Sequence, residues 1–79
     1  LSSTIDSSIL GGDCNSATDQ LYYYVSVSNN PSTIQVNDWV FSDINGANVL
    51  VDGYYHINQV NSQRMEIVNG VVTSLTLCP

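Results

Sequence analysis

The chain has no lysine, and Arg64 is its only side chain with a fixed positive charge. Proteins that bind nucleic acid contact phosphates through clustered lysine and arginine, so this composition excludes a nucleic-acid partner. Docking on an anionic membrane surface needs the same basic groups. The acidic residues give a formal net charge of -6, which keeps copies of the chain apart in solution.

Long hydrophobic runs are also missing. No apolar stretch approaches the roughly 18 residues that a transmembrane helix needs, so membrane insertion is not expected. No signal peptide is visible. The chain begins at Leu1 and not at Met, which fits either a removed leader or a piece of a longer protein. The one sequence close to an N-glycosylation site, Asn30-Pro31-Ser32, is blocked by its proline.

Only two cysteines are present, Cys14 and Cys78, and they enclose most of the chain. A zinc site needs four ligands and only His56 could join them, while neither cysteine lies in a catalytic motif. We therefore expect a disulfide, worth about 4 kcal/mol for a loop of this length, and no metal or cofactor. A disulfide implies an oxidising location, either extracellular or on a virion surface.

The chain is short enough for one domain, with residues 14–79 forming a disulfide-closed β domain. Residues 1–13 lie outside the disulfide loop, and their sparse apolar residues are Leu1, Ile5, Ile9 and Leu10. This segment is expected to be an assembly arm, an edge strand or a linker. Gly11-Gly12 marks a break after it.

Alternating side chains predict strands along the rest of the chain. In residues 21–28, we expect Leu21, Tyr23, Val25 and Val27 to face the core, and Tyr22 and Tyr24 to face outward. Further strands are expected at residues 33–36, 38–42, 48–51, 54–60, 64–68 and 71–77, with turns at 43–46, Asp52-Gly53 and Asn69-Gly70. A short helical turn around residues 15–20 is an alternative to a loop there. The pattern predicts an all-β fold, a small antiparallel sandwich or barrel of six to seven short strands.

Several of these pieces resemble a short, cysteine-flanked β domain of phage virion proteins and bacterial, notably Bacteroidetes, surface proteins. The matching pieces are Cys14, residues 22–24, Pro31, residues 38–43, Gly46, residues 53–57, residues 69–74 and Cys78. The resemblance covers residues 14–78 and implies a structural, receptor-facing or assembly role. It carries no catalytic residues to transfer.

Exposed aromatic side chains are candidates for contact with a glycan or a protein partner. They are Tyr22, Tyr24, Tyr54 and His56, and the lone Arg64 could bind a partner carboxylate. Trp39 and Tyr55 are expected in the core, and cross-strand packing is the simpler explanation for any of the aromatics. A single histidine without a motif does not predict a catalytic triad.

The sequence Asp43-x-Asn45-Gly46-x-Asn48 has oxygen ligands at alternate positions, as a calcium loop does. Its spacing lacks the bidentate acid, because Tyr54 stands where that acid would be, so we interpret it as a turn.

The sequence therefore predicts a non-enzymatic structural component of an extracellular assembly, such as a phage decoration, fibre or tail protein. Its partners would be other copies or neighbouring subunits. The alternative is a carbohydrate-binding or adhesive module that recognises a surface glycan.

Overall fold

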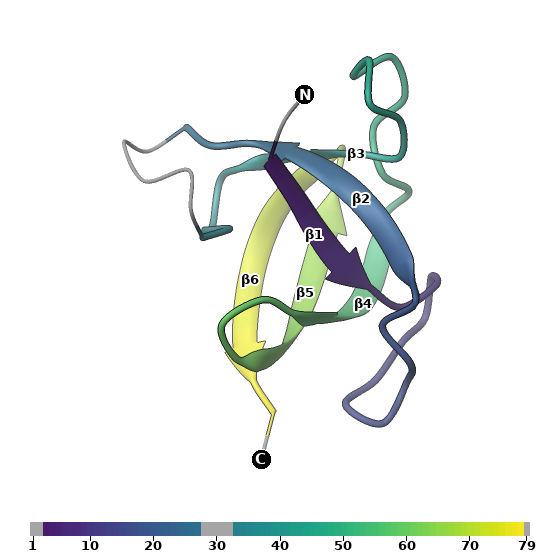
Figure 1. Ribbon diagram of the computed structural model, residues 1–79. Coiled ribbons are helices and arrows are strands. Elements are labelled where there is room, and N and C mark those ends of the chain that lie inside the picture. The colour runs from purple at the N-terminus through teal and green to yellow at the C-terminus, as the bar shows by residue number, and fades with distance from the viewer. Residues whose placement is uncertain (1–2, 28–32, 79) are drawn as a thin grey trace.

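The structure is a computed structural model, and it describes residues 3–27 and 33–78. All of its regular elements in this part of the chain are strands, which confirms the all-β prediction. They are β1 (Ser3–Ser7), β2 (Gln20–Val25), β3 (Trp39–Phe41), β4 (Gly53–Asn58), β5 (Ser62–Val68) and β6 (Val71–Leu77) (Figure 1). No helix in the described residues has the length and apolar character needed to cross a membrane.

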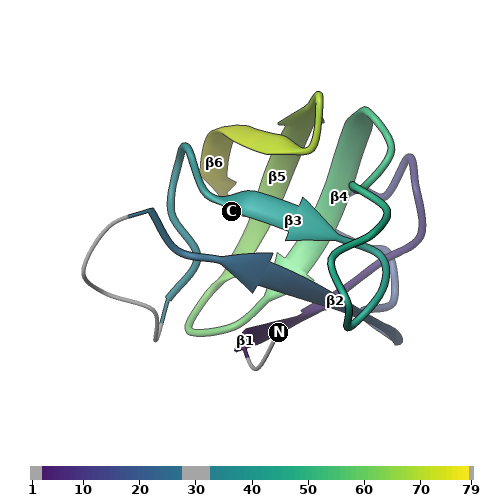
Figure 2. The same ribbon diagram turned by 90° about the horizontal axis from the view of Figure 1, so that it is seen from above.

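The six strands form one closed antiparallel barrel in the order β1-β2-β3-β6-β5-β4. It consists of two meanders of three strands each, β1–β3 and β4–β6, which face each other in Figure 2. Pairing is extensive within each meander, whereas each seam between them has a single registered pair, Ser7 with Ile57 and Trp39 with Val71. The barrel therefore resembles two small three-stranded sheets that are joined at two seams. It has features of both the predicted sandwich and the predicted barrel.

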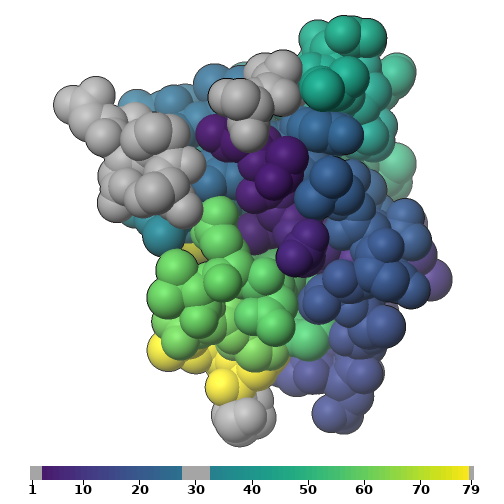
Figure 3. Space-filling model, viewed as in Figure 1, coloured from purple at the N-terminus to yellow at the C-terminus, as the bar shows by residue number. Residues whose placement is uncertain are grey.

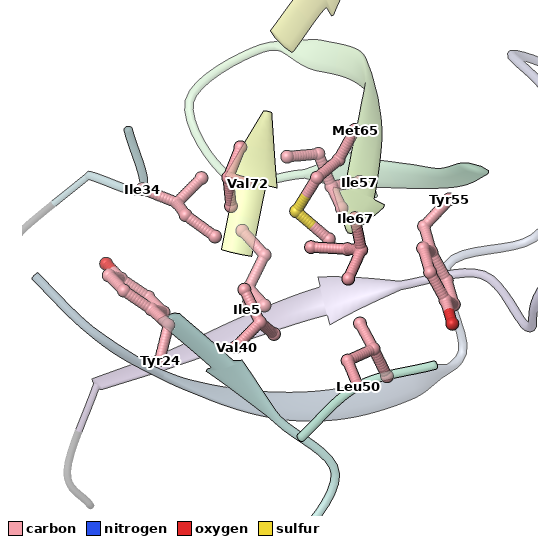
Figure 4. Packing of buried hydrophobic residues seen from close by; sticks show 10 residues of the cluster. All are labelled: Ile5, Tyr24, Ile34, Val40, Leu50, Tyr55, Ile57, Met65, Ile67 and Val72. Carbon is pink, nitrogen blue, oxygen red and sulfur yellow. The ribbon is translucent and has the colours of Figure 1, made fainter. Parts of the chain in front are cut away.

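The core lies between the two meanders and draws on every strand (Figure 4). Its buried hydrophobic residues are Ile5, Tyr24, Ile34, Val40, Leu50, Tyr55, Ile57, Met65, Ile67 and Val72. In β5, Met65 and Ile67 alternate with outward Arg64 and Glu66, because successive side chains of a strand point to opposite faces. The predictions of a buried Tyr55 and of a Met65–Ile67 core face are confirmed.

The predicted faces of residues 21–27 are wrong, and Ser28 lies outside the described residues. Tyr24 is 2% exposed, and Tyr22 packs against the core, whereas Leu21, Val25 and Val27 are exposed. The register explains the reversal: Ile5 of β1 lies opposite Tyr22, so both point inward. A tyrosine inside the barrel is tolerated because its hydroxyl finds a partner, and Gln59 Nε2 donates a hydrogen bond to Tyr24 Oη over 2.9 Å.

Residues 3–11 are an integral part of the barrel and not a free arm or an edge strand. Residues 3–7 pair with β2, and the same chain then continues along β4, where the Ser8 and Gly11 amides donate to the carbonyls of His56 and Tyr54. Ile5 is buried in the core, so it is not available to a neighbour. Ile9 and Leu10 are exposed, and Leu1 lies outside the described residues. Figure 3 shows β1, in purple, packed into the surface beside β2, in blue.

The predicted turns near the second meander are only partly present. Asn69 and Gly70 both have positive φ, 54° and 79°, as a two-residue hairpin between β5 and β6 requires, so that prediction is confirmed. Asp52-Gly53 is not a hairpin turn, because β4 starts at Gly53 and the preceding chain makes only the bridge from Val49 to Phe41. No strand forms at residues 33–36, and residues 15–20 contain no helical turn.

The disulfide joins Cys14 to Cys78 with a Cα–Cα distance of 5.8 Å and a sequence separation of 64. It ties the loop between β1 and β2 to the end of β6, and so links the first meander to the second. This pairing confirms the sequence prediction.

Candidate interaction surfaces

An apolar face covers the outside of β2 and β3. It consists of Leu21, Tyr23, Val25, Trp39, Phe41, Val49 and Val71, and we call it the Trp39 face. Antiparallel register sets these side chains in two rows on one side of the sheet, Val25–Trp39–Val71 and Tyr23–Phe41–Val49. Trp39 is 42% exposed because Val40, the residue between Trp39 and Phe41, is the one that points inward. The prediction of a buried Trp39 is therefore wrong.

The charges around the Trp39 face are acidic. Asp6 lies opposite Leu21 on the same side of the sheet, and Asp43 follows β3 two residues after Phe41. Asp52 accepts a hydrogen bond from the Asn69 amide over 2.8 Å, next to the hairpin that precedes Val71. The strand order places β5, which carries Arg64, three strands away from β2 in either direction. The only fixed cation therefore lies on the opposite side of the barrel.

Tyr54 and Arg64 form a second exposed group on that opposite side. The Arg64 guanidinium carbon lies 4.8 Å from the centroid of the Tyr54 ring, a cation–π distance, and Tyr54 is 45% exposed. Neighbouring Glu66 accepts a hydrogen bond from Thr73 Oγ1 over 2.8 Å. Of the residues predicted to contact a glycan or partner, these two are brought together at the surface. Arg64 covers one face of the Tyr54 ring.

His56 is a structural residue in this arrangement. It is 7% exposed and uses both ring nitrogens, with Nδ1 2.6 Å from the Ser16 carbonyl oxygen and Nε2 next to Ser62 Oγ. A carbonyl only accepts, so Nδ1 donates and Nε2 is free to accept the serine hydroxyl. The ring thus joins the loop between β1 and β2 to β4 and β5 near the disulfide. His56 and Tyr24 are therefore buried, and not exposed as the sequence predicted.

Tyr22 is partly buried beneath the surface. Its ring makes an edge-on contact with Tyr55, with centroids 5.9 Å apart and planes at 82°. Burial raises the pKa of both phenols, and that of Tyr55 rises to about 12, with nearby Tyr22 and Asp52 adding to the effect. Tyr55 Oη also donates to the Val51 carbonyl over 2.6 Å. These two tyrosines act as core residues.

The Asp43 loop is a turn held by its own carboxylate. The amides of Ala47 and Asn48 donate to Asp43 Oδ2 and Oδ1 over 3.1 and 2.9 Å, and these bonds lower the pKa of the carboxyl. Gly46 has a φ of 70° and closes the turn with a hydrogen bond to the Asp43 carbonyl. Within residues 3–27 and 33–78, no three metal-ligating side chains are grouped.

Asp38 is a fully buried carboxylate that the sequence did not single out. Its Oδ1 accepts from the Val27 amide and its Oδ2 from the Gln35 amide, over 3.0 and 2.9 Å. Its own main chain bonds to Val72 of β6. Asp38 therefore organises the entry into β3 and fixes the position of Trp39 beside it.

A hollow of about 320 Å³ lies beside the loop between β1 and β2 and is lined by Ser8, Ile9, Ser16, Ala17, Asp19 and Gln20. The Ser8 hydroxyl there already donates to the Ile9 carbonyl and accepts from the His56 amide, both over 2.9 Å. With its buried polar group satisfied, the hollow has little to fix a small ligand in one orientation.

Comparison with protein-family models, with curated proteins and with solved structures finds no match for this chain. The surface arguments above therefore rest on the chain's own residues. Sequence reasoning missed the Trp39 face. The alternation of Trp39 and Phe41 on one side was visible, but the sequence did not show which side of β3 faced the core.

Proposed function

We propose that this protein is a non-enzymatic structural component of an extracellular assembly, such as a phage decoration, fibre or tail protein. The observation that carries the proposal is the Trp39 face, a contiguous apolar and aromatic surface on an acidic barrel. Contiguous exposed apolar surface of this kind marks sites of protein contact, and tryptophan and tyrosine are enriched at their energetic centres. A neighbouring subunit would cover this face.

The disulfide and the composition support an extracellular setting. A bond that closes 64 residues stabilises a small barrel without a large core. The acidic rim around the Trp39 face favours a neighbour with an apolar patch bordered by basic residues, since charges of opposite sign across an interface select the partner. The partner's chemistry is thus complementary to this chain and not identical to it.

The experiment is incorporation into the native assembly. A tagged chain and its Trp39→Ser variant would compete for places in the particle that carries this protein. Val60→Ser is the matched control, because Val60 is 71% exposed in the turn between β4 and β5. We expect Trp39→Ser to be excluded and Val60→Ser to be incorporated like the parent. Equal incorporation of all three chains would contradict the proposal.

A carbohydrate-binding or adhesive module is the second candidate, and the Tyr54–Arg64 group favours it. A flat exposed ring beside a guanidinium and the Glu66 carboxylate offers stacking and hydrogen bonding together. The test is titration with a panel of glycans while the amide signals of Tyr54 and Arg64 are followed by NMR. Shifts confined to this group would support the module, and their absence at millimolar glycan would remove it.

A further inference from the structure

On the side of β6 that faces β3, no strand of the described residues pairs with residues 73–77. Strand β6 pairs with β5 along its length, but on its other side β3 contributes only the pair of Trp39 with Val71 and the bonds of Val72 with Asn37 and Asp38. Asn37, with a φ of 81°, lies in a turn before β3 that the Asp38 amide closes by donating to the Gln35 carbonyl. We call residues 73–77 the β6 edge. In the described part of the chain, no backbone hydrogen bond reaches this edge from the β3 side.

Alternation shows which backbone groups face outward there. The Cys78 amide donates to the Ser62 carbonyl over 3.0 Å, so Cys78 faces β5. In an antiparallel ladder, alternate residues point to opposite neighbours. Ser74 and Thr76 therefore face β5 as well, whereas the N–H and C=O groups of Leu75 and Leu77 point away from it. The register shift at Glu66/Ile67 accounts for the change of phase between Val72 and this stretch.

Apart from the β-bulge opposite Glu66/Ile67, the β6 edge lacks the devices that normally protect an edge. Proteins blunt such edges with lysine, proline or inward charges, and residues 73–77 contain none of these. Their sequence, Thr-Ser-Leu-Thr-Leu, includes two threonines, which favour extended structure. Leu77 is 64% exposed at the end of the strand. The edge is thus a template for an added strand.

We propose that the β6 edge pairs antiparallel with the β6 edge of a second copy of this chain, about a twofold axis at Leu75. Leu75 of each copy would exchange both main-chain hydrogen bonds with its counterpart, and Leu77 would lie opposite Thr73 of the second copy. The two meanders β4–β6 would then form one continuous six-stranded sheet. The partner follows from self-complementarity, because a twofold interface requires one surface to match itself.

Side chains on both faces of this sheet would match. On the inner face, Leu75 lies opposite Met65 in its own copy, so the two Leu75 side chains would meet beside the core. On the outer face, Arg64 pairs with Thr76, and Glu66 pairs with Ser74. Thr76 would lie opposite Ser74 of the second copy. Each cross-strand row would therefore carry Arg64 at one end and Glu66 of the second copy at the other.

The charges thus favour this register without forming a direct ion pair, because three strand spacings separate them by about 14 Å. Like charges at both ends of a row would instead repel. The net charge of -6 on each copy opposes the association overall. Salt screens that repulsion, so the dimer is expected to tighten as ionic strength rises.

The N-terminal segment was expected to contact a neighbouring subunit, but β1 already pairs with β2 and β4 of its own barrel. In the proposed dimer, the β6 edge makes the contact between copies instead. The β6 edge begins two residues after Val71 of the Trp39 face but shares no residue with it, and the proposed pairing is tested independently of the proposed function.

The first test is hydrogen exchange of individual amides at increasing protein concentration. At low concentration, we expect the Ser74 and Thr76 amides to be protected and those of Leu75 and Leu77 to exchange freely. As the dimer forms, protection should appear at Leu75 and Leu77. Free exchange at Leu75 and Leu77 up to millimolar concentration would overturn the proposal.

The second test is sedimentation of charge-matched variants. Leu77→Lys places a positive charge at the end of the β6 edge, and Val60→Lys makes the same change at an exposed position of the turn between β4 and β5. We expect Leu77→Lys to weaken self-association by about tenfold or more, equivalent to roughly 1.4 kcal/mol, and Val60→Lys to leave it near the parent value. Self-association that Leu77→Lys leaves intact and Trp39→Ser abolishes would contradict the β6 edge as the interface.

Discussion

The two meanders of the barrel contribute different kinds of side chain to the shared core. In β4–β6, the inward side chains are mostly aliphatic, with Met65 and Tyr55, whereas Arg64 and Glu66 point outward. In β1–β3, Tyr22 and Tyr24 point inward, while Leu21, Val25 and Trp39 are left outside. A small core gains large buried area from each tyrosine, provided that its hydroxyl is bonded. The first meander therefore has an apolar outer face, and the second a mixed polar one.

The disulfide joins these unlike halves, and its loss should have the largest effect. Replacing both cysteines by serine is expected to lower the free energy of unfolding by about 4 kcal/mol, because the unfolded chain regains the entropy of a 64-residue loop. Denaturant unfolding of the double variant and the parent measures this difference. A loss below about 1 kcal/mol would show that the meanders hold together without the bond.

Core truncation tests the reversed faces of β2. Tyr24→Ala is expected to cost about 3 kcal/mol, similar to Met65→Ala in the second meander, because both leave cavities. Leu21→Ala, on the Trp39 face, should cost less than about 1 kcal/mol, since its side chain is half exposed. Equal costs for Leu21→Ala and Tyr24→Ala in urea unfolding would restore the orientation expected from the sequence.

The hairpin of the second meander is tested at Gly70. A Cβ added there would lie 2.6 Å from Val49 Cβ at a φ of 79°. We expect Gly70→Ala to cost about 2 kcal/mol, from strain and contact together. Gly11→Ala is the matched control, because Gly11 has a φ of 83° but nothing within 4 Å. Thermal unfolding of the two variants should rank Gly70→Ala as the less stable. The reverse order would show that the Val49 side chain moves aside at little cost in free energy.

The smallest expected effect is a loss of stability at high pH. The pKa of Tyr55 rises from 10.0 to about 12 in the folded protein, so the fold favours the neutral phenol. Its contribution to stability is complete below pH 10 and is lost as the pH rises from 10 to about 12. Unfolding measured across this range should show a decline that Tyr55→Phe removes. An identical decline in the variant would assign it to other groups.

The second meander was largely predictable because its signals are local. Asn69-Gly70 fixes a hairpin, and the hairpin fixes the register that points Met65 and Ile67 inward. With only two cysteines, the disulfide had one possible pairing. The first meander depends on distant contacts instead. Both faces of residues 21–27 are apolar enough to be buried, and a slip of one residue exchanges them. Ile5 and Gln59, far away in the sequence, decide between them.

For the same reason, the sequence indicated the wrong surface residues. Alternation along their strands predicts exposed rings for Tyr24 and His56. Each of these side chains is instead buried and hydrogen-bonds to a polar group from another part of the chain. Tyr54 and Arg64 were predictable as surface residues because they lie on the polar side of a meander with clear alternation.

Residue-specific oxidation of Trp39 by hydroxyl radicals tests the central claim most directly. The isolated barrel and the barrel within its native assembly would be oxidised side by side and compared by peptide mass spectrometry. The account predicts strong oxidation of Trp39 in the isolated chain and clear protection in the assembly, with Val60 unchanged. Equal oxidation of Trp39 in both samples would contradict the Trp39 face as the docking surface.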